Sequence, residues 1–551
     1  MAFNFDRSCR LLGPFLGHTT DTETRIWLHM ADLQPGERRT LHVTVHPERH
    51  TARAVRRLPL VLSEQDCGVG VARVEGLEPD TLYAYRLWWD EAGLAPVDLG
   101  GLEPTDTCFR TLPRGGFEHQ LDFLVMSCHN PETAALDGAN GFAVWEQMPA
   151  IISHNKNVRF ALLIGDQIYA DEVERRVLRE KEPARRVELY LRTYRKYWSD
   201  VRYRRVLCQL PAYLMWDDHD ITDGWGSRED SFAGGSSDVF KPEWTLLFQS
   251  ARTAFQHMQA SRNPPPLSPG YEQGFDTCFR VGRAGFVLPD LRSHRNVRKG
   301  HVWTEAQQAA VARWVEAQRE HLEVLFFCSS VVFSHGDPGL EALVHGGMPY
   351  VLQGVSWLGS IRYAGLRRTV STFYKNIGDL RDDINDSWGS QPNRRAADRV
   401  LDFLFGLQNP PAGQKPLSVV VLTGDIHTPG YSTLYSSQPE HAAWPSIPHV
   451  VASPVSYQPF SWVAEALYRR LTRVVTLGER GTYSAQISHH FGHRNVVLTS
   501  LRNVASEEWH LKVKYYLEGH PEPRVLLFDL NRATSREALA WPHAREPSLV
   551  G

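Results

Sequence analysis

Apolar and polar residues alternate over short runs in the first part of the chain, up to about residue 115. Runs such as Thr24–His29 and Leu41–His46 carry apolar side chains at alternate positions, and turn-rich segments separate them. A period of two places one face of a strand toward a core and the other toward solvent. We therefore expect residues 1–115 to form an all-β sandwich domain.

One corner of this region resembles the fibronectin type III domains. Its residues, 76–87, read Gly-Leu-Glu-Pro-Asp-Thr-Leu-Tyr-Ala-Tyr-Arg-Leu. In those domains proline shapes the turn and a tyrosine hydroxyl bonds back to the backbone. The resemblance implies an immunoglobulin- or fibronectin III-like sandwich. Residues 111–117 contain a proline and two glycines between apolar runs and predict a linker to the next domain.

From Leu121 the pattern changes to apolar runs that alternate with helical stretches. Strands at 121–126 and 160–164, on either side of a helix around 142–152, predict a βαβ unit. The capping box Thr304-Glu-Ala-Gln predicts the start of another helix. The remaining expected elements are helices at 184–208 and 394–405 and strands at 324–328, 417–422, 496–501, 509–517 and 524–530. We expect residues 116–551 to form an α/β domain.

Composition narrows the class of protein but not its activity. The 551 residues are 42% apolar and 22% charged, as in ordinary globular proteins, and exceed the usual size of one domain. A formal net charge of -3 gives no general attraction to nucleic acid, so we expect no nucleic-acid binding. No run approaches the roughly 18 apolar residues of a membrane span, and Met1–Arg7 does not resemble the start of an export signal. We therefore expect a cytoplasmic protein with no membrane partner.

Four apolar runs end at side chains that bind metal ions in other proteins. The donors at or just after these ends are Cys128, Asp166, Tyr169, Asp218, His219, Asp220, Asp425 and His427. In open α/β sheets ligands bind outside the carboxyl ends of the strands, so ends that lie far apart in sequence can converge on one pocket. Carboxylates crowded into such a crevice repel one another unless cations are present. The pattern therefore predicts a metal centre.

Taken singly, several of these residues also fit an ordinary structural role. Asp166 after Gly165 fits a turn or helix cap, Tyr169 a buried phenol, and Cys128 a buried apolar thiol. The acidic residues at 217–220 fit either a metal site or a solvated loop. The alternatives stay open residue by residue, and the argument for metal rests on the whole set.

Taken together and in this order, the segments resemble the PhoD-like (alkaline phosphatase D) branch of the calcineurin-like metallophosphoesterases. The resemblance spans nearly the whole chain. Residues 290–295, Asp-Leu-Arg-Ser-His-Arg, are similar to that family's Asp-x-Arg-x-x-Arg segment, and Asp386-Ser-Trp-Gly with Arg394 and Arg395 is similar to another of its motifs. The resemblance implies a four-layer α/β fold, a β-sandwich core flanked by helices, behind the all-β domain.

The resemblance also implies a role for each candidate residue. The ligands of an iron-type ion would be Cys128, Asp166, Tyr169 and Asp425, and those of calcium or another divalent ion, such as manganese or zinc, would be Asp166, Asp218 and His427. His219 would be the proton donor or phosphate stabiliser, Asp220 its orienting partner and Arg292 a phosphate ligand. Ser329 and Ser330 stand about where other members place a histidine ligand, so the number and identity of the metals stay open.

The expected activity is hydrolysis of a phosphoric ester by a metal-activated water, with a small-molecule phosphate ester as substrate. A phosphodiesterase on the same scaffold is one alternative. A non-catalytic binding protein with a degenerate phosphatase domain is another, although retention of the whole donor set argues against it. Neither the natural substrate nor the oligomeric state follows from the sequence.

Overall fold

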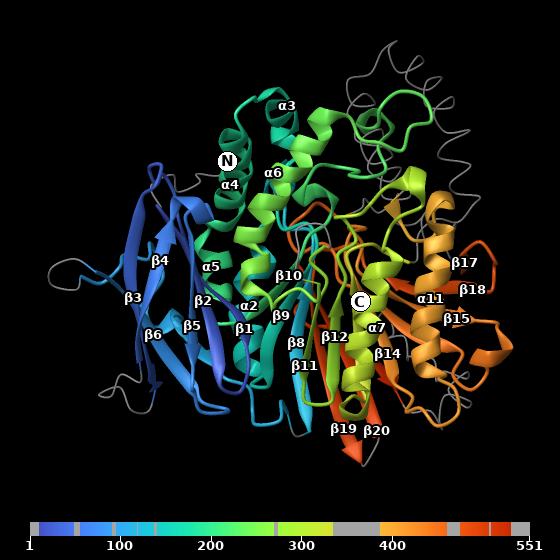
Figure 1. Ribbon diagram of the computed structural model, residues 1–551. Coiled ribbons are helices and arrows are strands. Elements are labelled where there is room, and N and C mark those ends of the chain that lie inside the picture. The colour runs from blue at the N-terminus through green and yellow to red at the C-terminus, as the bar shows by residue number, and fades with distance from the viewer. Residues whose placement is uncertain are drawn as a thin grey trace, which may run out of the picture.

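Two β-sheets stacked face to face form the centre of the molecule (Figure 1). The structure is a computed structural model and describes residues 10–48, 56–90, 95–117, 119–136, 140–268, 274–333, 386–459, 474–505 and 508–530. The first sheet has the strand order β10 (Ala212–Met215), β9 (Val158–Ile164), β8 (Gln120–Met126), β19 (Asn495–Ala505), β20 (Glu508–Leu517), β21 (Arg524–Asp529). The second has the order β11 (Thr277–Val281), β12 (Ala284–Leu288), β13 (Val324–Ser329), β14 (Ser418–Thr423), β16 (Ser446–Val451), β15 (Gly430–Ser436), β18 (Tyr483–His490), β17 (Val474–Leu477).

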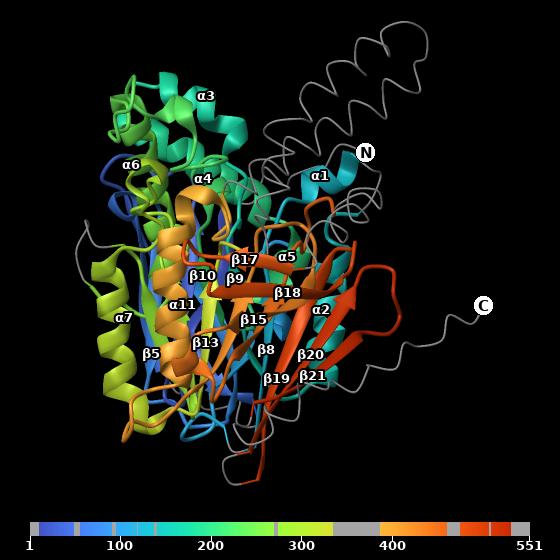
Figure 2. The same ribbon diagram turned by 90° about the vertical axis from the view of Figure 1, so that its right-hand side faces the viewer.

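Aromatic side chains fill the space between the two sheets. Phe123 of the first sheet meets Phe286 and Phe326 of the second edge to face, with ring centroids 5.3 and 5.1 Å apart. The outer face of the first sheet is covered by α2 (Ala143–His154), α4 (Pro183–Trp198), α5 (Val201–Leu207) and α6 (Pro242–Met258). The outer face of the second is covered by α7 (Glu305–Gln318) and α11 (Arg394–Gln408), which lie next to each other (Figure 2). The mixed α/β core with several sheets that the sequence predicts is confirmed.

Parallel pairing in both sheets sets the place of the site. Strands β8, β9 and β10 are parallel, and so are β12, β13, β14 and β16. Their carboxyl ends therefore lie at one edge of each sheet, where loops gather the side chains that follow the strands.

The N-terminal residues form two further antiparallel sheets. One contains β1 (Leu11–Thr19), β2 (Glu23–Met30) and β5 (Val69–Glu75); the other contains β4 (Arg56–Ser63), β3 (Arg38–Pro47), β6 (Leu82–Trp89) and β7 (Cys108–Arg110). The backbone N–H of Glu78 donates to the Tyr83 hydroxyl at 2.8 Å, which is the kind of corner bond expected there. Assignment to the immunoglobulin or fibronectin III class stays a prediction, as does the boundary at residue 115.

Aromatic side chains and one arginine join these N-terminal sheets to the α/β core. Trp27 of β2 stacks on Phe15 of β1, with ring centroids 5.4 Å apart, and meets Trp198 of α4 at 6.4 Å. The guanidinium carbon of Arg262, in the 3-10 helix Ala260–Arg262, lies 4.9 to 5.3 Å from the ring centroids of Phe15, Trp27 and Trp198. The junction is thus part of one continuous hydrophobic core.

The expected helix at 184–208 is interrupted. It divides into α4 and α5 because the Asp200 carboxylate accepts a hydrogen bond from the Arg202 backbone N–H at 2.9 Å and caps a new helix. The helices α1 (Pro131–Leu136) and α3 (Asp171–Arg179), and strands β15 to β18, were not expected from the sequence. No helix in the described ranges is long and apolar enough to cross a membrane.

Candidate metal centre

Residues at three strand ends adopt a backbone conformation that L-amino acids rarely take. Cys128 follows β8, Asp166 follows β9, and Asp425 and His427 follow β14, with φ angles of +57°, +53°, +75° and +50°. A left-handed residue costs free energy unless the surroundings hold it, and such residues gather at functional sites. Here the left-handed residues turn the chain sharply after each of the three strands.

Two glycines let the strand ends approach one another. A side-chain carbon on Gly165 would lie 2.9 Å from Cβ of Asp217, and Gly165 itself has φ +96°. A side-chain carbon on Gly424 would lie 2.5 Å from the carbonyl oxygen of Ile164. The Gly-Asp pairs at 165–166 and 424–425 therefore serve close packing as much as chain reversal.

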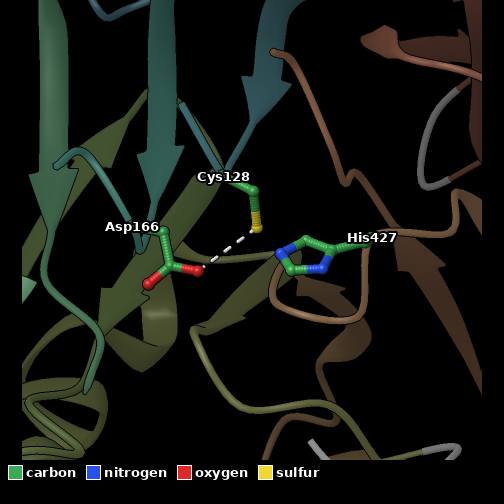
Figure 3. A group of neighbouring side chains, drawn as sticks. All are labelled: Cys128, Asp166 and His427. Atoms are coloured by element: carbon green, nitrogen blue, oxygen red, sulfur yellow. Dashed lines mark hydrogen bonds between the residues drawn. The ribbon is translucent and has the colours of Figure 1, made fainter. Parts of the chain in front are cut away.

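Cys128, Asp166 and His427 point toward one another from three loops (Figure 3). Their donor atoms all lie within 4.8 Å of one another, and all three residues are buried. The Cys128 thiol donates to Asp166 Oδ2 at 3.3 Å, and the Tyr169 hydroxyl donates to the same oxygen at 3.4 Å. The Tyr169 oxygen also lies 3.2 Å from His427 Nε2. Four of the predicted ligands thus share one cluster.

Asp425 and Asp218 extend this cluster on either side of Asp166. Carboxylate oxygens of Asp166, Asp217 and Asp425 lie within 4.8 Å of one another, as do donor atoms of Asp166, Asp218 and His219. Asp166 is common to both groups and to the cluster around Cys128. Asp166 is therefore the residue that the three candidate groups share, and its role as a ligand common to two ions stays a prediction.

The electrostatics of the cluster fit bound cations. Burial, with opposition from His219 and reinforcement from Asp217, raises the pKa of Asp166 well above its usual value. Asp166 Oδ1 and Asp217 Oδ2 are buried and have no hydrogen-bond partner among the residues described. Burial, and then His219, lowers the pKa of His427 to about 3, so its imidazole is neutral at pH 7, as a metal ligand requires. The donor set of thiol, phenol, imidazole and carboxylates therefore fits transition-metal and divalent ions.

Two serine hydroxyl groups lie next to the sulfur of Cys128. The Ser453 hydroxyl donates to its sulfur at 3.0 Å, and the Ser127 hydroxyl lies 3.4 Å away. Burial, together with the charge of Asp166, raises the pKa of the thiol well above its usual value. A bound cation would reverse this, because metal coordination deprotonates a thiol.

Arg292 is fully buried and contacts the carboxylates of Asp217, Asp218 and Asp386. Its guanidinium donates to Asp217 Oδ1 and to Asp386 Oδ2, and it reaches Asp218 Oδ1 at 3.4 Å. The Ser330 hydroxyl donates to Asp217 at 2.8 Å, so the serine found near the expected histidine position holds a carboxylate. In this arrangement Arg292 anchors Asp217 and Asp218, and its expected phosphate contact stays a prediction.

His219 is paired with Asp171 rather than with Asp220. His219 Nδ1 lies 2.7 Å from Asp171 Oδ2, at the start of α3. Asp220 instead accepts hydrogen bonds from the Asp217 backbone N–H at 2.9 Å and from Gln259 Nε2 at 2.8 Å. The structure therefore differs from the expected orienting partner, because the chain turns Asp220 away into the core.

Neighbours of the site that the sequence analysis missed are Asp171, Ser453 and Tyr457. Tyr457 stacks on the His427 ring at a centroid distance of 3.7 Å and on Tyr169 at 5.1 Å. Asp171 lies only five positions after Asp166, so its spacing was a usable signal. Nothing in the local sequence marks Ser453 or Tyr457, which follow His427 by 26 and 30 positions and reach the cluster through the next loop.

The amino-acid sequence resembles those of known proteins. Residues 123–323 match the sequence model of the family described as PhoD-like phosphatase. An uncharacterized protein of Saccharomyces cerevisiae is 19% identical over an alignment of 335 residues, and the match covers 50% of this chain and 46% of the yeast protein. The chain thus spans about half the length of this curated relative.

Two solved structures share the fold. The structure of PhoD has a TM-score of 0.61 at 14% identity, covering 97% of this chain and 92% of PhoD. A purple acid phosphatase from yellow lupin (Lupinus luteus) seeds has a TM-score of 0.51 at 13% identity, covering 94% of this chain and 74% of that protein. Residues 123–323 thus match the PhoD-like phosphatase family, within a fold that PhoD and the purple acid phosphatase share.

Proposed function

We propose that this protein is a metal-dependent hydrolase of phosphoric esters. The observation that supports it best is the convergence of Cys128, Asp166 and His427 with further buried carboxylates at adjoining strand ends. So many acidic groups in a buried crevice need cations for charge balance. The match of residues 123–323 to the PhoD-like phosphatase family supports phosphoric ester hydrolysis as the reaction class.

The ligands divide into two sets around Asp166. Cys128, Tyr169 and Asp425 offer a soft thiolate, a phenolate and a carboxylate for an iron-type ion. Asp218 and His427 offer oxygen and nitrogen for calcium, manganese or zinc on the other side. Metal ions bound there would stabilise charge on the phosphoryl oxygens and make a water molecule more acidic.

His219 would hold the proton for the leaving group. Burial alone would lower its pKa, but Asp171 and Asp218 outweigh burial and hold the pKa well above its usual value. The contact between Nδ1 and Asp171 leaves Nε2 of the protonated ring as the free donor. A proton at Nε2 can pass to the departing alkoxide, as general acid catalysis requires.

Metal analysis of the purified protein, combined with assays on p-nitrophenyl phosphate and bis-p-nitrophenyl phosphate, tests the proposal. We expect at least one equivalent of tightly bound metal and hydrolysis that is lost on chelation and restored by metal. The ratio of the two rates assigns the enzyme to monoesters or diesters, which the fold leaves open. Less than half an equivalent of metal, with no activity restored by iron, calcium, manganese or zinc, would favour the non-catalytic binding protein.

A further inference from the structure

A cavity of about 500 Å³ lies where the N-terminal sheets meet α6. One wall is Arg25 of β2, and a second is the end of α6 with Arg252 and Gln256. The third is the segment 260–266 together with Phe275. Its volume is in the range of pockets that hold metabolite-sized ligands.

The charged residues that line this cavity are cationic. Arg25 and Arg252 both line it, and no carboxylate does among the residues described. His257 also lines it, but burial lowers the pKa of its imidazole, so this ring is neutral at pH 7. The acidic residue nearest to Arg25 in the chain, Glu23, is held by Arg73 at 2.5 Å. The wall therefore carries two cationic side chains and no acidic one, with the carboxylates of Asp276 and Asp290 behind it, 3.1 and 3.2 Å from where a side-chain carbon on Gly274 would lie.

The remaining wall is apolar and stiff. Pro264, Pro265 and Pro266 line it in succession, with Ala260 and Phe275 nearby. Proline fixes its own φ angle, so this wall loses little conformational entropy when a ligand binds. The Arg25 guanidinium is itself held in place by the carbonyl oxygens of Asn263 and Ser261, the latter at 3.4 Å. The cavity thus presents a fixed cationic side and a fixed apolar side.

We propose that this cavity binds a small organic anion, with its anionic group held by Arg25 and Arg252 and its apolar body against the three prolines. The inference does not depend on the metal centre, because the cavity and that centre have no residue in common. The ligand class is an aromatic or aliphatic sulfonate, carboxylate or phosphate of metabolite size.

Isothermal titration of the full chain with 1-naphthalenesulfonate tests the proposal, since no phosphatase cleaves this anion. The neutral 1-naphthalenesulfonamide is the matched ligand. We expect one saturable site that binds the sulfonate at least tenfold more tightly than the sulfonamide. Equal affinity for the two ligands, or no binding of the sulfonate, would overturn the proposal.

A pair of variants on α6 locates the binding. Gln256 and Gln249 are both exposed on this helix, but only Gln256 lines the cavity. A carboxylate in the wall should repel the anion, so we expect Gln256→Glu to weaken the sulfonate about tenfold. Gln249→Glu has the same net charge and should bind as the original protein does. Equal affinities in the two variants would place the sulfonate elsewhere and refute the assignment.

Discussion

At the scale of single residues, the pairing of His219 with Asp171 leaves two roles to distinguish, proton donor and metal ligand. His219 lies within 4.8 Å of Asp166 and Asp218 donors, so its position alone also suits a ligand. The 2.7 Å contact of Nδ1 with Asp171 suits both roles, because a carboxylate at one ring nitrogen can orient a proton donor or a metal ligand. The two roles predict different behaviour on substitution.

We expect His219→Ala to keep its metal and its fold but to lose a factor of about 10²–10⁴ in kcat, the usual contribution of general acid catalysis. The loss should be smaller for p-nitrophenyl phosphate than for an alkyl phosphate, because p-nitrophenolate leaves without a proton. Elemental analysis and kcat on both substrates measure this. His427→Ala is the comparison and should lose metal and activity together; the same metal loss in His219→Ala would make His219 a ligand.

Asp171→Asn should change the pH dependence of the reaction. The amide can still accept a hydrogen bond from Nδ1 of His219, but it no longer raises the pKa of the ring. A proton donor is lost as pH rises through its pKa, so a lower pKa moves the fall in kcat to lower pH. A profile of kcat against pH measures the shift. An unchanged alkaline limb would mean that His219 does not supply the proton.

The third residue-scale prediction concerns the thiol of Cys128. We expect Cys128→Ala to lose metal and Cys208→Ala to retain it, because Cys128 donates to Asp166 whereas the Cys208 sulfur donates to backbone carbonyls of Asp106 and Arg205. Metal content of the two purified variants measures this. If the bound metal is iron, a visible charge-transfer band should disappear in Tyr169→Phe. Equal metal content in both cysteine variants would remove Cys128 from the ligand set.

Local sequence motifs predict the candidate metal ligands better than they predict the hydrogen-bond partners that orient the site residues. Asp166, Asp425 and Cys128 directly follow apolar runs, so the sequence marks them at the strand ends where the structure brings them together. Asp220 was expected to orient His219 because the two are adjacent in sequence. Adjacent residues in a turn point in different directions, and the partner came instead from Asp171 at the start of α3.

At the scale of secondary structure elements, the strands of the parallel sheets are predictable because they are continuous apolar runs. The elements that are hard to predict from the sequence are short, or they mix apolar and polar residues. Asp200 reads as an ordinary polar residue within a helical pattern until its capping bond to Arg202 is seen. Strands β15 and β18 alternate between buried and partly exposed positions, and only their pairing with β16 and β17 fixes them in the second sheet.

Arg262 gives an element-scale prediction at the junction of the N-terminal sheets with α4. It is fully buried, and none of its three side-chain nitrogens has a hydrogen-bond partner in the described ranges. Its contribution is therefore contact with the rings of Phe15, Trp27 and Trp198. Burial lowers the pKa of its guanidinium to about 10, so the charge itself is costly there.

We expect Arg262→Ala to reduce the free energy of unfolding by about 2–5 kcal/mol, the usual cost of a core cavity. Arg262→Met keeps most of the volume and removes the buried charge, so it should recover most of that loss. Urea unfolding of both variants measures the difference. Equal destabilisation by the two substitutions would show that the charge, and not the volume, maintains the junction.

At the scale of the whole molecule, the candidate metal centre joins the two sheets. Cys128 and Asp166 follow strands of the first sheet, whereas Asp425 and His427 follow β14 of the second. Ions held by both sets would bind the folded protein and not the unfolded chain. Such binding adds about 2.7 kcal/mol to stability when free metal is 100-fold above its Kd.

Removing the metal should therefore lower the stability of the α/β core. We expect thermal unfolding of the chelated protein at a lower temperature, with recovery when metal is returned. Cys128→Ala, which should already lack metal, should respond less to chelation. An unfolding temperature that is the same with and without bound metal would mean that the ions contribute only to catalysis.

The order of the ligands along the chain also has a consequence during synthesis. Cys128, Asp166 and Asp218 leave the ribosome about 200 to 300 residues before Asp425 and His427. Until β14 emerges, the nascent chain holds only part of the coordination shell and would bind ions weakly or bind the wrong ones. Contacts between residues so far apart in sequence form late in folding. Correct metal loading should therefore follow the completion of the second sheet, and the protein should acquire its ions only after translation is nearly finished.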